Sequence, residues 1–136
     1  MPQVKGSFEV KRAPQASLEA GDGQEIGHFR FDKTFRGPLE AASVVHMLAV
    51  GTPVDGSAAY VAIERIAGTL DGRSGSFYSQ HSGIMDRGRP SLSLTVVPDS
   101  GTDGLEGLRG SMQIDIVDGQ HHYTFDYDFD HGDPTP

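Results

Sequence analysis

The sequence predicts a single all-β domain, an eight-stranded antiparallel up-and-down β-barrel. Two Asp-Gly pairs each lie midway between runs of alternating apolar and polar residues, which is typical of tight β-hairpins. Eight extended runs follow one another, and none shows the apolar spacing of a helix. Short turns join most of the runs into a meander. Pairing the first strand with the last would remove both exposed edges.

The expected strands follow one another along nearly the whole chain. In the first, Val4, Gly6, Phe8 and Val10 alternate with polar residues, so one face is buried and the other faces water. A two-sheet sandwich is the alternative, but its crossings usually need longer connections than the turns of this chain provide. We expect a barrel domain over residues 1–130 and a frayed polar tail over 131–136. The strands are expected at residues 4–11, 25–35, 39–50, 58–70, 73–85, 91–97, 108–117 and 121–129.

The turn at Asp118-Gly119 fixes the pairing of the last two strands. Folding the chain back there sets Ile114 opposite Tyr123 and Met112 opposite Phe125. The companion face carries polar and charged residues, which is typical of a solvated outer wall. The inward face therefore also holds Gly110, Ile116, His121 and Tyr127.

The turn at Asp71-Gly72 pairs two further strands, but both faces mix polar and apolar residues. We assign the face of Phe77 to the interior because it supplies an aromatic ring beside small residues, as a tapering barrel requires. That register places Glu64 and His81 inside as diagonal neighbours on adjacent strands. Three more residues share this face: Tyr60, Ala62 and Ser79.

Lys33 adds a third charged candidate to the interior. Alternate residues of a strand face the same side, and Lys33 alternates with Phe31 and Phe35, so it has the same inward parity. A lysine inside a barrel needs a carboxylate partner. Glu64 is the candidate partner. A whole strand separates the two, so we expect the contact to cross the lumen or to be bridged by water.

The longer connections predict where the barrel opens. Residues 12–24 and 51–57 fall at one end if the strands alternate in direction, and the glycine-rich run 98–107 falls at the other. We expect the mouth beneath the first two, because mobile loops can admit a ligand.

Composition excludes several classes of function. The chain has no cysteine, so thiol chemistry and disulfides are excluded. A net charge of -8 opposes phosphate binding, and no run approaches a membrane span, so we expect neither a nucleic-acid nor a membrane partner. The amino terminus lacks a signal-like segment, and we expect a cytoplasmic protein. The six histidines lack the spacing of a metal site, so no metal and no cofactor are expected.

Three segments resemble a known bacterial family. The block over residues 60–83, the run 96–110 and the segment 121–127 are similar to the domain-of-unknown-function family 3224. That family resembles the allene oxide cyclase and dirigent barrels, which have a lipocalin-like architecture. Asp103 stands where those relatives have a tighter turn. The resemblance implies the barrel, and it implies no activity.

The interior residues suggest a function in ligand binding. We expect the lumen to bind a small hydrophobic or amphipathic molecule, with Glu64 as the candidate general acid or base if the chain is an enzyme. Two alternatives stay open: an isomerase or cyclase that uses this carboxylate, and a filled barrel that acts through its outer surface as an oligomeric module. The expected ligand-binding residues are Lys33, Tyr60, Glu64, Ser79, His81, Tyr123 and Tyr127.

Overall fold

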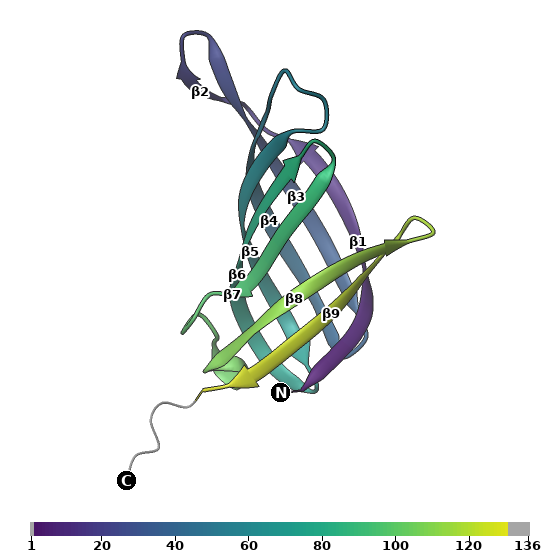
Figure 1. Ribbon diagram of the computed structural model, residues 1–136. Helices are drawn as coiled ribbons and strands as arrows, with labels where there is room; N and C mark the ends of the chain where they lie inside the picture. The colour runs from purple at the N-terminus through teal and green to yellow at the C-terminus, as the bar shows by residue number, and fades with distance from the viewer. Residues whose placement is uncertain (1, 131–136) are drawn as a thin grey trace.

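The computed structural model describes residues 2–130 of the chain. These residues form a closed antiparallel barrel of eight strands with one short additional strand (Figure 1). The predicted tail, residues 131–136, lies outside the described residues. The elements are β1 (Gln3–Pro14), β2 (Leu18–Gly21), β3 (Gln24–Arg36), β4 (Leu39–Gly51), β5 (Ala58–Leu70), β6 (Arg73–Asp86), β7 (Arg89–Val96), a 3-10 turn η1 (Asp103–Leu105), β8 (Leu108–Val117) and β9 (Gln120–Phe129).

The sheet closes as the sequence predicts. Neighbouring strands in the sheet are neighbours in the chain from β3 to β9, and β1 pairs with both β9 and β3. Because β1 pairs with both β9 and β3, neither β9 nor β3 is left as an edge strand there, which removes the usual site of edge-to-edge association. The up-and-down topology is therefore confirmed.

Both predicted hairpin registers are confirmed. Ile66 lies opposite Phe77, and Met112 lies opposite Phe125. Asp71 and Gly72 have φ values of 49° and 83°, and Asp118 and Gly119 have 52° and 78°. Positive φ at both central residues is the type I′ geometry, whose twist matches that of the flanking strands.

The segment 12–24 contains a hairpin that the sequence reading missed. We expected a long connection there, but β1 continues to Pro14, and β2 pairs with the beginning of β3. The turn between β2 and β3 is Asp22-Gly23, with φ values of 51° and 76°. This is a third Asp-Gly turn of the same kind. The short polar runs beside it hid the signal, because all four residues of β2 are exposed.

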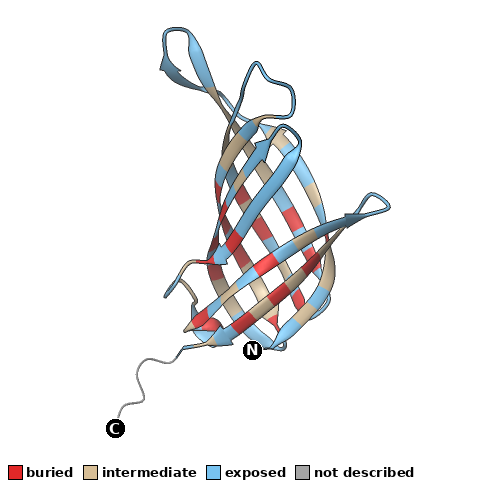
Figure 2. Cartoon of the chain, in the orientation of Figure 1, coloured by how far each residue is buried: buried red, intermediate tan, exposed pale blue. Residues whose placement is uncertain are grey.

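One end of the barrel is filled by large apolar side chains, and we call it the closed end. Buried residues concentrate there in Figure 2. The hydroxyl of Tyr123 accepts a hydrogen bond from the backbone N–H of Leu39 at 3.0 Å and donates one to the carbonyl of Arg36 at 3.0 Å. The buried cluster of the closed end consists of Phe8, Phe35, Leu39, Ile66, Leu70, Phe77, Leu94, Val96, Leu105, Leu108, Met112, Tyr123, Phe125 and Tyr127.

The barrel wall is weakest between β7 and β8. These strands share a single paired position, Thr95 opposite Ser111, and the β8–β9 hairpin diverges from β7 beyond it (Figure 1). Leu92 and Ile116 have inward parity, yet they are 46% and 66% exposed. The prediction that Ile116 is interior is therefore wrong, because the strand that would cover it has separated from its neighbour.

Candidate functional site

A cluster of buried polar side chains lies in the middle of the lumen. Four consecutive strands, β3 to β6, supply its members, which are the buried polar residues of the described chain. Burying polar groups in a barrel is unfavourable unless each group finds a partner. The cluster consists of Lys33, Ser43, Glu64, Ser79 and His81.

The carboxylate of Glu64 is the centre of the cluster, and four side chains contact it. Its Oε1 lies 2.7 Å from Nε2 of His81, 3.4 Å from Nζ of Lys33 and 3.4 Å from Oγ of Ser79. Its Oε2 accepts a hydrogen bond from Oγ of Ser43 at 2.5 Å. The predicted neighbours Glu64 and His81 are therefore in direct contact, and both carboxylate oxygens are hydrogen-bonded.

Lys33 reaches Glu64 directly, which corrects the expectation of a contact across the lumen or through water. Lys33 pairs with Ser43 on β4, and Ser43 pairs with Ile66 on β5. Glu64 lies two residues from Ile66, at the next inward position of β5. The short side chain of Ser43 leaves room for the lysine to pass over β4. Its ammonium also lies 4.9 Å from the ring centroid of Phe8, within the range of a cation–π contact.

The environment of Glu64 keeps this carboxylate ionised. Burial alone would raise its pKa, but the hydrogen bond from His81 and the charge of Lys33 outweigh burial and lower the pKa below its ordinary value. An ionised carboxylate cannot donate a proton at neutral pH. The arrangement therefore favours Glu64 as an anchor for His81 and Lys33 over Glu64 as a general acid.

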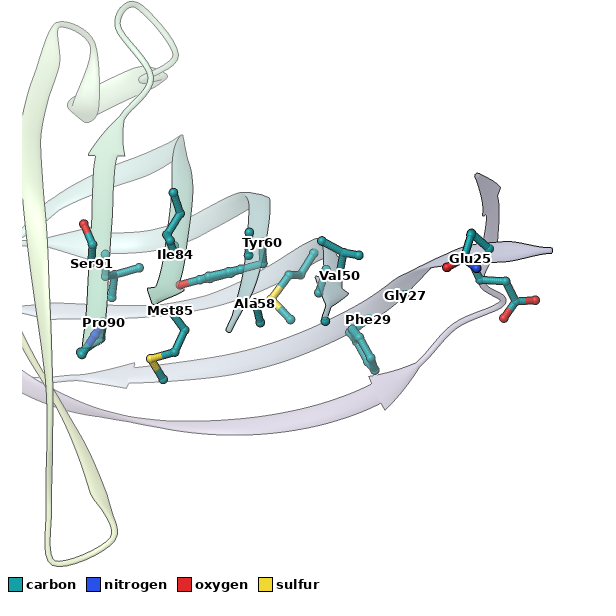
Figure 3. Close-up of a pocket in the computed structure, with 17 residues that line it drawn as sticks. Glu25, Gly27, Phe29, Val50, Ala58, Tyr60, Ile84, Met85, Pro90 and Ser91 are labelled. Carbon is teal, nitrogen blue, oxygen red and sulfur yellow. The ribbon is translucent and has the colours of Figure 1, made fainter. Parts of the chain in front are cut away.

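The other end of the barrel is hollow, and we call this space the cup. It has a volume of about 690 Å³. Its lining residues, shown as sticks in Figure 3, lie at the end of the barrel that carries β2 and the loop over residues 52–57 (Figure 1), where the mouth is expected. Most of its lining is apolar. The lining residues are Gln24, Glu25, Gly27, Phe29, Met47, Ala49, Val50, Gly51, Ala58, Ala59, Tyr60, Gly83, Ile84, Met85, Pro90, Ser91 and Leu92.

Tyr60 is the aromatic wall of the cup, and Gly83 makes room for its ring. A Cβ atom at Gly83 would lie 2.7 Å from the ring of Tyr60, which is closer than real Cβ atoms approach. The two residues are paired across β5 and β6. In Figure 3 the side chain of Tyr60 lies along the inner side of the sheet, toward β6. The missing side chain at Gly83 therefore shapes the cup.

The polar cluster lies directly below the cup. On β4 to β7 the pairing stacks three inward layers, of which the first lines the cup, the second contains His81 and the third contains Glu64. A ligand in the cup would therefore meet the histidine before the carboxylate. From the mouth inward the layers are Ala49, Tyr60, Gly83 and Leu92; then Met47, Ala62, His81 and Leu94; then Val45, Glu64, Ser79 and Val96.

The predicted site residues separate into three groups. Lys33, Glu64, Ser79 and His81 form the cluster, and Tyr60 lines the cup. The remaining two tyrosines lie in the closed end, away from both. Tyr123 is hydrogen-bonded to backbone there, and Tyr127 donates a short hydrogen bond to the carboxylate of Asp71.

The sequence did not predict most of the residues that line the cup. Gly27, Ala49 and Gly83 are small residues with inward parity, and they lie at paired positions on β3 to β6. These small residues lie on the same inward face of their strands as the buried aromatic residues. Small residues at inward positions predict where the lumen is empty, so they could have predicted the cup. Phe29 and Met47 share this parity and complete the apolar wall.

Two further findings concern metals and membranes. Within residues 2–130 no three histidine, aspartate or glutamate side chains come together as a metal site would require. His28 and His46 meet on the outer wall, with Nε2 and Nδ1 3.0 Å apart. No helix in this part of the chain is long and apolar enough to cross a membrane.

Comparison with known proteins identifies relatives of this chain. Residues 4–127 match the model of DUF3224, described as a protein of unknown function. A crystal structure of a DUF3224 protein of unknown function from Shewanella oneidensis MR-1 is 48% identical, with a TM-score of 0.89. The alignment covers 96% of this chain and 98% of that one. No curated protein matches.

Proposed function

Because this chain belongs to the DUF3224 family, whose description names no activity, we propose its function from the site itself: the cup binds a small, largely apolar molecule. The observation that carries the proposal is an open apolar cavity of about 690 Å³ above a satisfied polar cluster. Small-molecule sites generally have about 300–1,000 Å³ and apolar walls with a few polar groups.

The lining supports an apolar ligand. Phe29, Met47, Tyr60 and Met85 provide aromatic and thioether surface, and methionine adapts to ligands of irregular shape. Few charged groups line the cup, and Glu25 lies toward the mouth (Figure 3). A ligand with an apolar body would bury that body against these side chains and would keep any charged group near the mouth.

The polar cluster supports the cup by its shape. Each nitrogen and oxygen in it that is fully enclosed has a partner, so the cluster forms a fixed floor that large apolar side chains do not occupy. A fixed floor limits how deeply a ligand can enter. The isomerase or cyclase alternative is less well supported, because the four donors around Glu64 hold its carboxylate in place. The likeness to allene oxide cyclase barrels stays a prediction.

Nile red, an uncharged apolar dye, tests the proposal. Its fluorescence rises in apolar surroundings, and we expect saturable binding to the purified protein. Ala49→Phe places a ring in the cup and is expected to weaken binding by about tenfold or more, about 1.4 kcal/mol. Ala42→Phe on the outer side of the same strand is the matched control and is expected to leave binding unchanged. Equal binding by the wild-type protein and both variants would remove the cup as the site.

The outer wall supports a second proposal, that two copies of this chain associate. Val61, Ile63 and Ile84 are 54%, 49% and 59% exposed on the outer face of β5 and β6. The outward positions 44–50, 59–65 and 78–84 carry no carboxylate, although the chain has a net charge of -8. Two copies that meet at this face would therefore bring no carboxylates together at these positions.

Light scattering after size exclusion tests this second proposal. The wild-type protein is expected to have the mass of a dimer, and Ile63→Glu is expected to have that of a monomer. Thr69→Glu, on the same strand and farther from the apolar face, is expected to remain dimeric. A monomeric wild-type protein at high concentration would refute the proposal.

A further inference from the structure

His81 has one ring nitrogen that the cluster does not use. Resting on the proposed function of the cup, we propose that the cup selects uncharged ligands with a hydroxyl group and that Nδ1 of His81 accepts their hydrogen bond. An alcohol or phenol with an apolar body fits this description.

The tautomer of His81 follows from its contact with Glu64. Oε1 of Glu64 lies 2.7 Å from Nε2 of His81, and an ionised carboxylate can only accept a hydrogen bond. Nε2 must therefore carry the proton in this pair. In a neutral imidazole the other nitrogen then has a free lone pair, so Nδ1 is an acceptor.

Nδ1 makes no hydrogen bond and is not fully enclosed. Among residues 2–130, each side-chain nitrogen or oxygen that is cut off from solvent has a hydrogen-bond partner. The hydrogen bonds of the His81 ring, to Glu64 and to Ser79, both run through Nε2. Nδ1 makes no such hydrogen bond and is therefore not fully enclosed, although His81 is only 6% exposed.

The register places His81 one inward layer from the lining of the cup. His81 lies in the layer directly below the cup, two residues along β6 from Gly83. The ring of Tyr60 lies over Gly83, in the inward layer next to that of His81. Tyr60, in the layer above His81, brings a hydroxyl group to the lining of the cup.

The charges beneath the cup favour an uncharged hydroxyl over an acid or an amine. Lys33 and Glu64 form a buried ion pair, so their charges offset each other close to His81. A carboxylate ligand would meet the lone pair of Nδ1 with a lone pair of its own. An ammonium group beside His81 would lose its hydration without a free carboxylate there to replace it, because four donors already surround Glu64.

Competition against Nile red with naphthol and with its methyl ether tests the inference. The two compounds have nearly the same apolar body, but only naphthol has a hydrogen to donate. We expect naphthol to bind the wild-type protein about tenfold more tightly, as one neutral hydrogen bond to an otherwise unpaired acceptor would give. Naphthoate, which is charged, is expected to bind more weakly than naphthol.

Two variants locate the effect. His81→Phe keeps the size of the ring and removes the acceptor, so the preference for naphthol is expected to fall to less than about twofold. His122→Phe, on the outward face of β9, is the matched control and is expected to keep the full preference. A preference that survives in folded His81→Phe would overturn the inference.

Nitrogen NMR of the wild-type protein gives a readout that does not depend on the variants. The long-range ¹H–¹⁵N spectrum is expected to show the Nε2–H tautomer of His81, with the Nδ1 signal moving when naphthol is added. An Nδ1–H tautomer, or equal binding of naphthol and its ether, overturns the inference and leaves the proposed function intact. Failure of Nile red and both naphthalene compounds to bind overturns the proposed function itself.

Discussion

The closed end and the cup are built on the same strands, yet one is filled and the other is hollow. At the closed end β4 begins with Leu39 and β5 ends with Leu70, and both side chains are fully buried. At the cup the same two strands place Ala49 opposite Tyr60 and Ala58 opposite Gly51. These two strands are paired from one end to the other, so between them only the volume of the inward side chains differs. The separation of the β8–β9 hairpin from β7 adds to the opening at the cup.

The polar cluster lies at the boundary between these two ends. Large apolar residues lie on one side of Glu64 along β5, beginning with Ile66, and Ala62 and Tyr60 lie on the other. A buried ion pair is weak evidence for stability, because desolvation offsets much of its attraction. Its position suggests instead that it holds open a lumen that apolar residues would otherwise close.

The sharpest contrast between the two ends is expected from truncating one phenylalanine in each. Phe77→Ala removes a ring that is 1% exposed and is expected to lower the free energy of unfolding by about 4 kcal/mol. Phe29→Ala removes a half-buried ring of the cup and is expected to cost about 1 kcal/mol. Urea denaturation measures both. Equal losses would contradict the difference between a filled end and a hollow one.

Glu64→Gln tests the polar cluster between the closed end and the cup. It is expected to have the next largest effect on the free energy of unfolding. It leaves the buried ammonium of Lys33 without its counter-charge, which typically costs about 3 kcal/mol. The pKa of Glu64 is lowered in the folded protein, so its contribution is complete above the ordinary value of 4.5 and is lost as the pH falls through the folded value.

The stability difference between the wild-type protein and Glu64→Gln should therefore shrink as the pH falls below about 4.5. Lys33 and His81 face the same carboxylate and must be present in both proteins for the comparison. Thermal unfolding from neutral to acidic pH gives the measurement. A difference that stays constant over that range would show that the ionised carboxylate does not stabilise the fold.

Gly83→Ala changes the cup with a smaller cost. The new Cβ would overlap the ring of Tyr60, and because the end of a side chain can move, the loss of stability is expected to be about 1 kcal/mol. The displaced ring should weaken Nile red binding by several-fold. Ser82→Ala, at the exposed outward position next to Gly83 on β6, is the control and is expected to bind normally. Normal binding by Gly83→Ala would remove Tyr60 as a wall of the site.

The smallest expected effect belongs to the hydroxyl of Tyr127 at the closed end. Burial, together with the hydrogen bond to Asp71, raises the pKa of Tyr127 to about 12, and the nearby charge of Arg73 opposes this. The contribution of this hydroxyl is therefore complete below the ordinary value of 10 and is lost as the pH rises toward 12.

Tyr127→Phe is expected to cost about 1 kcal/mol at neutral pH and progressively less above pH 10. Nile red binding should be unchanged, because Tyr127 lies at the closed end. Urea denaturation at pH 8 to 11, about the range in which tyrosine begins to ionise, measures the stability change. A loss of dye binding in this variant would contradict the separation of the two ends.

The sequence predicted the strands and hairpins well because their signals are local. Asp71-Gly72 and Asp118-Gly119 fix the register of four strands, and β5 and β8 have the predicted bounds. The contact between Glu64 and His81 followed directly from that register. The hairpin at Asp22-Gly23 was missed because its exposed strand has no apolar alternation.

The rest of the site depends on three-dimensional features that no local pattern encodes. Lys33 reaches Glu64 because Ser43 is short and the strands are staggered around the barrel. Tyr123 and Tyr127 share the inward parity of the site residues but lie at the opposite end, since parity gives the face of a strand and not the height in the lumen. The cup itself is the part of the lumen that the inward side chains of several strands, far apart in the sequence, do not fill.

The most direct test of the central claim is an NMR titration of the wild-type protein with naphthol. Backbone amide shifts would show which end of the barrel takes the compound. We expect saturable shifts at Gly27, Ala49 and Gly83, and none at Tyr123 or Tyr127. Shifts that cluster at the closed end, or on the outer face of β5 and β6, or no shifts at saturating naphthol, would contradict the account of the cup as a binding site.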